Sequence, residues 1–319
     1  MLAVRPLRRD SHTIQLGLDP DRAVVVEGAD PAALGCLDLL DGTRTEAAVL
    51  TEAARRGIPD AAGTLGLLRG EGLLVDAHRL LPPGTPEPIR RRLLPEAAAL
   101  ALARPAHHPA DVVRRRRQAR IRVAGRGRLL APVATGLAEA GVGHVEPAPG
   151  GQPGRRSVII EAIRGCAPDT ETRPLRERGP TFAVQLGLSS PPRLTALRYG
   201  SRGVPHLAAW LRDGTAVVGP LVRPRLTPCL RCVDLHRRDR DPAWPVLAAQ
   251  LATAPDEPEA CAAATVSAAA AVIVAEVLRH VDGERPDTLG RTVELTSPGR
   301  IRGRPWSAHP ECDCGANRH

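Results

Sequence analysis

The sequence predicts an α/β protein in which a small α+β domain precedes a larger domain of alternating strands and helices. Residues 119–319 alternate short β-branched segments with helical patterns, which is the order of an α/β fold. Residues 1–78 carry a complete pattern of their own, in which strands are followed by three short helices. Residues 79–118 are rich in proline and arginine and are typical of a linker.

The first domain is expected to open with a hairpin. "HTIQLGL" places Ile14, Leu16 and Leu18 on one face with the period of a strand, and "AVVVEG" supplies the second strand after the turn "DPDR". The first helix is expected to begin with Asp30 as its N-cap and Pro31 in its first turn.

Two further helices complete this domain. Thr43 and Glu46 have the spacing of a capping box, and Gly57 marks the end of the second helix. A third helix is expected over about residues 60–69, followed by the extended segment "GLLVDA". Strands followed by three short helices predict a winged-helix-like module.

The larger domain shows a strand, a glycine turn, a helix and a second strand in "IRVAGRGRLLAPVATGLAEAGVGHVEP". Four more segments are expected to form strands: "SVIIEAI", "TFAVQLGL", "VPHLAAWLRDG" and "TAVVGPLV". "ACAAATVSAAAAVIVAEVLRHVDG" predicts a long buried helix whose alanines allow close packing. In the linker, one helix is expected over about residues 95–104.

Composition allows two domains and predicts a soluble protein of the cytoplasm. The chain has 319 residues and a formal net charge of +9, and every basic residue other than histidine is arginine, because no lysine occurs. Aromatic residues make up only 2%, so the core must be aliphatic. No uninterrupted apolar run of about 18 residues occurs, and "MLAVRPLRRD" lacks the apolar stretch of a signal peptide.

Arginine runs at 90–92 and 114–117 raise the question of a nucleic-acid partner. The simpler interpretation is a solvated linker helix, and the alternative is an arm that binds a polyanion. The scarcity of aromatic residues argues against stacking on single-stranded nucleic acid.

Two close cysteine pairs predict a structural zinc site. Cys229 and Cys232 are separated by two residues, and Cys312 and Cys314 by one, so four thiolates are offered to a tetrahedral ion. Four thiolates leave no open position for water, so the ion would join the C-terminal segment to a loop about eighty residues earlier. His309 could replace one sulfur. The other interpretations are redox chemistry and unrelated free cysteines.

Three cysteines are single. Cys36 lies in an apolar helix and is expected in the core, as is Cys261, whose alternative role is a thioester nucleophile. The segment "LHRRDRDPAW" alternates in charge and predicts either a solvated helix or a docking surface with Trp244 as its apolar anchor.

The glycine turn "VAGRGRLLAPVA" resembles a turn that holds phosphate groups. Gly125 and Gly127 follow a strand and precede a helix, so helix N–H groups would face the anion. The third glycine of the dinucleotide pattern is missing, because Leu130 stands in its place.

Residues 119–319 resemble the ThiF/MoeB-like adenylating proteins of the ubiquitin-activating type. The resemblance rests on this turn, "TAVVGPLV", "TPCLRC", the alanine-rich helix and the terminal "CDC", which follow one another in that order. Within that superfamily, "GPLVRPRLTPCLRCVDLHRRDRDPAWPVLAAQL" is most similar to TOMM-type (bacteriocin) cyclodehydratase partner proteins. Those proteins join an N-terminal RiPP recognition element, a PqqD-like winged helix, to a Rossmann-like ThiF body. The resemblance implies the same two-domain architecture here.

The sequence departs from active members at the nucleotide site. They carry a glycine-richer turn, an acid after the second strand, an arginine and a lysine on a following helix, and an aspartate that holds magnesium. Here Ser189 and Ser190 stand where that aspartate is expected, and no lysine exists. Without that carboxylate we expect neither ATP nor magnesium to bind and assign no catalytic residue. A vestigial nucleotide turn remains, formed by Gly125, Gly127 and Glu146.

The resemblance implies a scaffold that binds a precursor leader peptide and presents the peptide to a YcaO-type enzyme, which uses ATP to form azolines. The leader would add as a strand beside Val24 and Val26, against a groove wall that includes Leu65 and Leu68. The alternative is that these four residues only fill the small core. A homodimer is expected from the resemblance.

Two other functions stay open. An ATP-dependent adenylyltransferase acting on a peptide or carrier-protein C-terminus is favoured by the intact strand–turn–helix pattern. A DNA-binding regulator is favoured by the winged-helix order and the arginine content. The expected third helix, "DAAGTLGLLRG", has one arginine and little to read base edges, which argues against nucleic acid.

Overall fold

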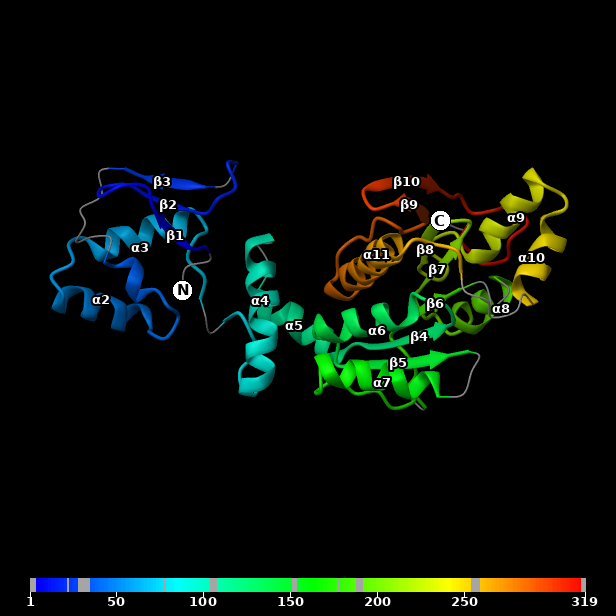
Figure 1. Cartoon of the computed structure of the whole chain (residues 1–319), viewed down its shortest axis with the longest axis horizontal. Coiled ribbons are helices and arrows are strands. Elements are labelled where there is room, and N and C mark those ends of the chain that lie inside the picture. The colour runs from blue at the N-terminus through cyan, green and yellow to red at the C-terminus, as the bar shows by residue number, and fades with distance from the viewer. Residues whose placement is uncertain are drawn as a thin grey trace. The chain divides into compact units, whose positions relative to one another are not determined.

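The structure is a computed structural model that describes residues 4–21, 23–27, 35–76, 79–103, 108–150, 154–176, 178–187, 192–253 and 259–316. The chain divides into two compact units, Met1–Arg114 and Arg115–His319 (Figure 1). The expected helix start at Asp30 and Pro31, and the serines Ser189 and Ser190, lie outside the described residues.

The first unit contains a three-stranded antiparallel sheet and short helices. The strands are β1 (Pro6–Arg8), β2 (Ile14–Leu16) and β3 (Val24–Val26), and the order β1-β2-β3 leaves β3 at an edge. The helical elements are η1 (Leu37–Leu39), α2 (Glu46–Arg55) and α3 (Ala61–Gly70). Cys36 is fully buried among them, as expected. Strands followed by helices therefore match the predicted order.

Helix α2 is capped differently from the prediction. Thr45, not Thr43, accepts a hydrogen bond from the N–H of Ala48 at 3.3 Å and is the N-cap. Thr43 instead gives its N–H and its hydroxyl to the Asp41 carboxylate. Thr43, which the capping-box spacing had favoured, therefore stabilises a turn before α2 and does not cap the helix.

The proline- and arginine-rich stretch contains two helices, α4 (Glu87–Ala103) and α5 (Pro109–Gln118). The single helix predicted over 95–104 was too short, because Pro95 lies inside α4 and does not begin it. Leu93, Ala97 and Leu100 share one face of α4 and bury against Val112 and Val113 of α5. This packing holds the helix continuous through the proline.

The second unit is built on a seven-stranded mixed sheet with the order β10-β9-β8-β7-β6-β4-β5. Strands β4 to β7 are parallel, and β8 to β10 run antiparallel to their neighbours. The strands are β4 (Arg120–Gly125), β5 (His144–Pro149), β6 (Phe182–Leu186), β7 (His206–Arg212), β8 (Thr215–Val222), β9 (Arg291–Ser297) and β10 (Arg300–Pro305).

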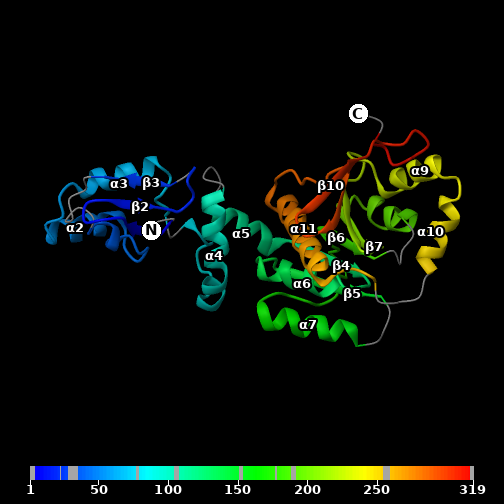
Figure 2. The ribbon, with the colours of Figure 1, turned by 45° about the horizontal axis from the view of Figure 1, so that its top comes forward.

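Helices cover both faces of this sheet (Figure 2). One face packs against α6 (Leu130–Glu139), α7 (Arg155–Cys166) and α11 (Ala263–Asp282), which enclose the main aliphatic core. The other face carries α9 (Leu230–Arg240) and α10 (Trp244–Thr253) over β7 and β8. The short segments α8 (Pro192–Thr195) and η3 (Ala196–Gly200) precede β7.

The segment "SVIIEAI" is helical, so its prediction as a strand was wrong. It lies within α7, where Ile159 and Ile163 are both buried and stand four residues apart. Val158 on the same helix is 65% exposed. The burial pattern has the helical period, which a short β-branched run does not reveal by itself.

The arginine run at 114–117 is not a simple solvated surface. Arg116 is 2% exposed, and its guanidinium binds both carboxylate oxygens of Asp282, itself 3% exposed, at 2.8 and 2.7 Å. Arg117 pairs with Asp169 at 2.5 Å. Two of these arginines therefore join the start of the second unit to its core.

Helix α11 is long and apolar enough, by length and composition, to cross a membrane. Its buried residues include Val266, Ile273 and Val277, which belong to the main core. It also buries Glu276, whose carboxylate accepts hydrogen bonds from the N–H and hydroxyl of Thr288 at 2.6 Å. These contacts are those of a core helix, as the sequence predicted.

Candidate functional site

Four cysteines meet beyond the C-terminal end of β8. Cys229 is the N-cap of α9 and Cys232 lies in its first turn, while Cys312 and Cys314 follow β10 in a turn closed by a hydrogen bond from the Cys312 N–H to the His309 carbonyl at 2.9 Å. All four sulfurs lie within 4.8 Å of one another. The structure thus brings together the two pairs that the sequence paired.

The spacing of the sulfurs fits zinc. Zinc–sulfur bonds of about 2.3 Å in a tetrahedron separate the sulfurs by about 3.8 Å. Here Cys229 lies 3.9 Å from Cys232 and 3.6 Å from Cys312, and Cys232 lies 3.6 Å from Cys314. The cluster could therefore hold a metal such as zinc through four thiolates.

The thiols differ in acidity because they share hydrogen bonds. A hydrogen bond from the Cys229 thiol lowers the pKa of Cys232 to about 4, whereas burial raises the pKa of Cys312 to about 12. Thiolates this close repel one another unless a cation lies between them. A bound divalent ion supplies that cation and would hold the four together.

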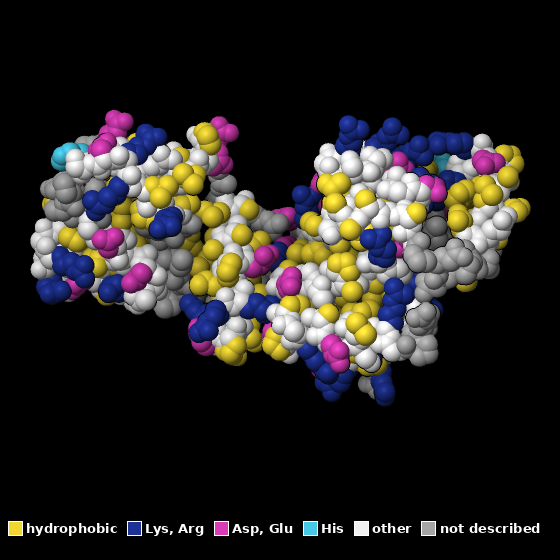
Figure 3. Space-filling model, in the orientation of Figure 1, with side chains coloured by type: hydrophobic (Ala, Val, Ile, Leu, Met, Phe, Trp, Pro, Cys, Tyr) yellow, Lys and Arg dark blue, Asp and Glu magenta, His cyan; other side chains and the backbone are white. Residues whose placement is uncertain are grey.

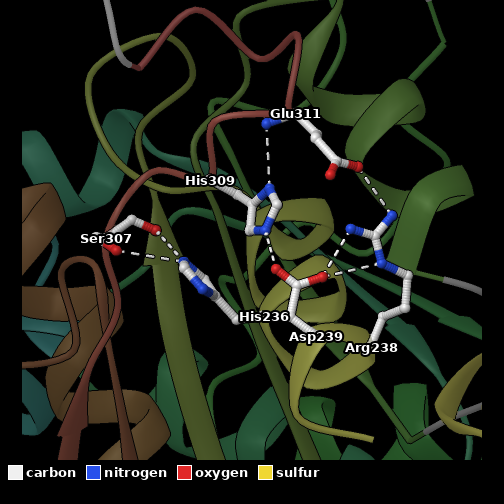
Figure 4. Close-up of polar contacts among 6 residues, drawn as sticks. All are labelled: His236, Arg238, Asp239, Ser307, His309 and Glu311. Carbon is white, nitrogen blue, oxygen red and sulfur yellow. Dashed lines mark hydrogen bonds and ion pairs between the residues drawn. The ribbon is translucent and has the colours of Figure 1, made fainter. Parts of the chain in front are cut away.

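His309 is not among the residues whose ligand atoms cluster, so its expected role as an alternative ligand was wrong. Its Nδ1 accepts a hydrogen bond from the Glu311 N–H at 3.1 Å, which leaves Nε2–H to donate to the Asp239 carboxylate at 2.8 Å (Figure 4). Arg238 binds both Asp239 and Glu311. This network fastens α9 to the segment that carries the second cysteine pair.

The glycine turn directly follows β4, at the C-terminal end of the parallel strands. Both glycines have positive φ, +119° at Gly125 and +96° at Gly127. A Cβ on Gly125 would stand 1.9 Å from the carbonyl oxygen of Leu186, so the turn passes close to the end of β6. Only glycine fits this conformation and this approach.

A carboxylate of the chain itself lies against this turn. Glu259 accepts a hydrogen bond from the Arg128 N–H at 3.3 Å, and a Cβ on Gly127 would meet the same carboxylate at 2.5 Å. The Arg128 guanidinium reaches the carbonyls of Glu259 and Cys261. A negative charge therefore stands beside the glycine turn, at an N–H two residues before α6 begins.

Glu146, the acid of the predicted vestigial nucleotide turn, is also engaged. It is 4% exposed, and its two oxygens accept hydrogen bonds from the guanidinium of Arg122 at 2.8 and 2.9 Å. This hydrogen bonding raises the pKa of Arg122, and burial raises the pKa of the neighbouring Tyr199. The acid is a partner of Arg122 and is not a free acceptor.

An open cleft of about 870 Å³ lies over β4 and β5 on the face that carries α9 and α10. Arg122, Arg198 and Arg202 contribute to its lining, and the described residues that line it include no aspartate or glutamate. Such a lining suits an anion without a metal, because magnesium–nucleotide complexes need a carboxylate for the ion.

Replacing Glu259 with alanine should test whether its carboxylate keeps anions away from the glycine turn. Loss of one acceptor at a helix N-terminus is expected to lower the melting temperature by about 2–4 °C, which corresponds to about 1 kcal/mol. Inorganic phosphate should then raise the melting temperature of Glu259→Ala more than that of the wild type. Thermal denaturation over a phosphate series measures both effects, with Glu161→Ala on α7 as the exposed control. Equal phosphate responses would contradict the assignment.

All three tryptophans of the chain surround Arg237 of α9. The guanidinium carbon lies 4.9 Å from the ring centre of Trp244, 5.4 Å from Trp210 and 6.0 Å from Trp306. Burial lowers the pKa of Arg237 to about 10. Trp244 also donates its indole N–H to Asp234 at 2.5 Å. The proposed docking anchor thus packs within its own unit.

The four predicted peptide-binding residues separate into two groups. Val24 and Val26 lie on the edge strand β3, where Val26 is 38% exposed. Leu65 and Leu68 of α3 are buried in the small core, and Leu67 between them is 73% exposed.

Sequence reasoning missed Glu259 and Arg237. Glu259 stands 131 residues after Arg128, the residue it caps, so no local pattern joins them. Arg237 lies in the charge-alternating segment. The one sequence feature that could have indicated its packing among tryptophans is that tryptophan is rare in this chain. Cys261, expected in the core, is only partly buried beside the carbonyl of Gly214.

No family model and no curated protein matches this chain. Solved structures do match. E. coli MccB with AMPCPP and selenomethionine MccA shares 16% identity with a TM-score of 0.64, and 99% of each chain is covered. The microcin C7 biosynthetic enzyme MccB in complex with N-formylated MccA shares 16% identity with a TM-score of 0.60, and 99% of each chain is covered. PaaA shares 15% identity with a TM-score of 0.62, covering 96% of this chain and 99% of its own.

At this level of identity the likeness establishes the fold. The second unit, with its large mixed sheet and its four clustered cysteines, has a ThiF/MoeB-like fold, and the resemblance seen in the sequence is confirmed to that extent.

Proposed function

We propose that this protein binds the leader of a precursor peptide and presents the peptide to a YcaO-type, ATP-dependent cyclodehydratase that forms azolines. In this proposal the protein does not activate a substrate with ATP. Its peptide-binding role is supported by the likeness to MccB, which has been solved in complex with the peptide MccA. Its four-cysteine site holds a structural zinc ion.

The observation that carries the non-catalytic role is the carboxylate of Glu259 at the glycine turn. Its oxygens lie against Gly127 and accept a hydrogen bond from the Arg128 N–H, so a phosphate that approached this turn would meet a like charge. Arg122 engages Glu146, and the described lining of the cleft offers no carboxylate to magnesium.

The leader would bind at the free edge of β3. Val25 and Val26 are 37% and 38% exposed there, and β3 pairs with β2 on its other side only. A strand added to this edge would gain backbone hydrogen bonds, with side chains alternating between the sheet face and solvent.

Peptide titration tests the binding role. The expected ligand is a short Cys/Ser/Thr-rich peptide encoded beside this gene and a YcaO-type gene. We expect Val26→Asp to weaken binding of its fluorescein-labelled leader about tenfold in fluorescence anisotropy, because a carboxylate would be desolvated beneath the added strand. Val158→Asp on α7, at a valine that is 65% exposed, should bind as the wild type does. Equal loss in both variants, or no binding by the wild type, would refute the proposal.

The second candidate is an ATP-dependent adenylyltransferase, favoured by the likeness to E. coli MccB solved with ATP. Calorimetry with magnesium–ATP and an assay of pyrophosphate exchange into ATP separate the two. The scaffold predicts no binding and no exchange. Exchange by the purified chain, with or without a peptide, would establish the enzyme instead.

We further propose a homodimer. Helix α10 leaves Val246 and Leu251 63% and 41% exposed, and the α8–η3 segment leaves Leu194 and Leu197 each 57% exposed. Apolar side chains of this size on neighbouring surface helices are typical of an association surface.

A further inference from the structure

Strand β10 presents an unpaired edge with an unusual charge pattern. It is the last strand in the sheet order and pairs with β9 on one side only. Arg302 and Arg304 alternate along it, so their side chains share one face of the sheet, and Arg300 continues this spacing beyond an irregularity in the pairing between Arg300 and Ile301. Figure 3 shows basic side chains in a row along this part of the second unit, where Figure 1 places β10.

These arginines lack acidic partners. Within the described ranges none of the three forms an ion pair, and Arg304 has only a cation–π contact with Trp306 at 5.6 Å. Glu294, directly opposite Arg302 on β9, instead binds Arg212 of β7 at 3.1 Å. Among the residues that the structure describes, no carboxylate therefore pairs with the positive charge along this edge.

The opposite face of the same strand carries an exposed apolar side chain at its beginning. Ile301, between the first two arginines, is 58% exposed, whereas the guanidinium of Arg291 lies where a Cβ on Gly303 would stand. Over this first part of β10, a bound strand would meet cations on one face and an isoleucine on the other, so its own side chains should alternate there between acidic and apolar.

We infer that the free edge of β10 binds an extended acidic segment of a partner protein by strand addition, with carboxylates facing Arg300, Arg302 and Arg304. Backbone hydrogen bonds would supply affinity, and the alternating side chains would supply register. Arginine guanidinium groups form charge-assisted hydrogen bonds with carboxylates. The inference goes beyond the leader-binding role and does not rest on it.

The same charges disfavour a second copy of this chain as the occupant. Two β10 edges pairing with each other would bring arginines of like charge close together across the strands, which is destabilising. Charge complementarity therefore selects an acidic partner.

The probe is a fluorescein-labelled hexapeptide of alternating Glu and Val, titrated into the full-length protein by fluorescence anisotropy at low salt. We expect saturable binding that Arg302→Glu weakens about tenfold, since one attraction becomes a repulsion. Arg302→Lys should retain most of the affinity. The control Arg164→Glu makes the same charge change on exposed α7 and should bind as the wild type does. Far-UV circular dichroism confirms that each variant is folded.

Two further peptides separate strand addition from general electrostatics. A peptide with Glu-Glu-Glu-Val-Val-Val keeps the charge but loses the alternation, and a backbone N-methylated alternating peptide keeps both but loses the edge hydrogen bonds. Each should bind about tenfold more weakly. Equal affinity for all three peptides, equal loss in Arg302→Glu and Arg164→Glu, or no saturable binding would overturn the inference.

Discussion

Replacing Cys232 with serine is expected to abolish metal binding and to lower the melting temperature by about 10 °C or more. Cys232 is fully buried, and its sulfur lies within 3.9 Å of two other thiols, so no neighbouring group can take its place. Structural zinc contributes directly to folding, and in a unit of this size about 4 kcal/mol of lost stability corresponds to a shift of this extent.

Elemental analysis and thermal denaturation measure the two effects. The wild type should contain one zinc ion per chain and release it to a chelator together with four reactive thiols. Cys166→Ser, at a partly buried cysteine outside the cluster, should retain the zinc and most of the stability. Full metal content in Cys232→Ser would show that the four sulfurs do not form the site.

Removing the carboxylate of Asp282 is expected to destabilise the second unit by about 3–5 kcal/mol, because the buried guanidinium of Arg116 would lose its ionic partner. The corresponding drop in melting temperature is about 6–20 °C. Chemical denaturation of Asp282→Ala should show this loss, and Glu284→Ala at the exit of α11 is the nearby acidic control.

The double replacement Arg116→Met with Asp282→Leu should recover much of the stability, since it removes both charges and keeps the volume apolar. A double variant as unstable as Asp282→Ala would mean that the ionic contact is not what stabilises this position.

The parts of the fold that local patterns encode were predictable. The short apolar segments of β4, β7 and β8, the alanine-rich α11 and the two cysteine pairs are all recognisable from residues close together in the sequence. Where two local patterns competed, prediction was wrong. "SVIIEAI" has β-branched residues but is helical, because Ile159 and Ile163 bury one side of α7.

Contacts between distant residues were not predictable from one sequence. Arg116 meets Asp282 across 166 positions, and Glu259 caps the glycine turn across 131. Each residue alone is an ordinary surface type, and only the folded chain shows that Arg116 is buried and that Glu259 lies against the glycine turn. The glycine turn itself was recognisable in the sequence, whereas the carboxylate beside it was not.

The cysteine cluster and the arginine-lined cleft are neighbours. Val222, at the end of β8, lies level with Arg122 of the cleft through the register of β8, β7, β6 and β4. Leu197 and Ser201 line both the cleft and the hollow beside Cys229 and Cys314. Oxidation or chelation of the thiols should therefore disturb one wall of the cleft as well as the C-terminal segment, so that changes at the two sites in evolution are coupled through this shared wall.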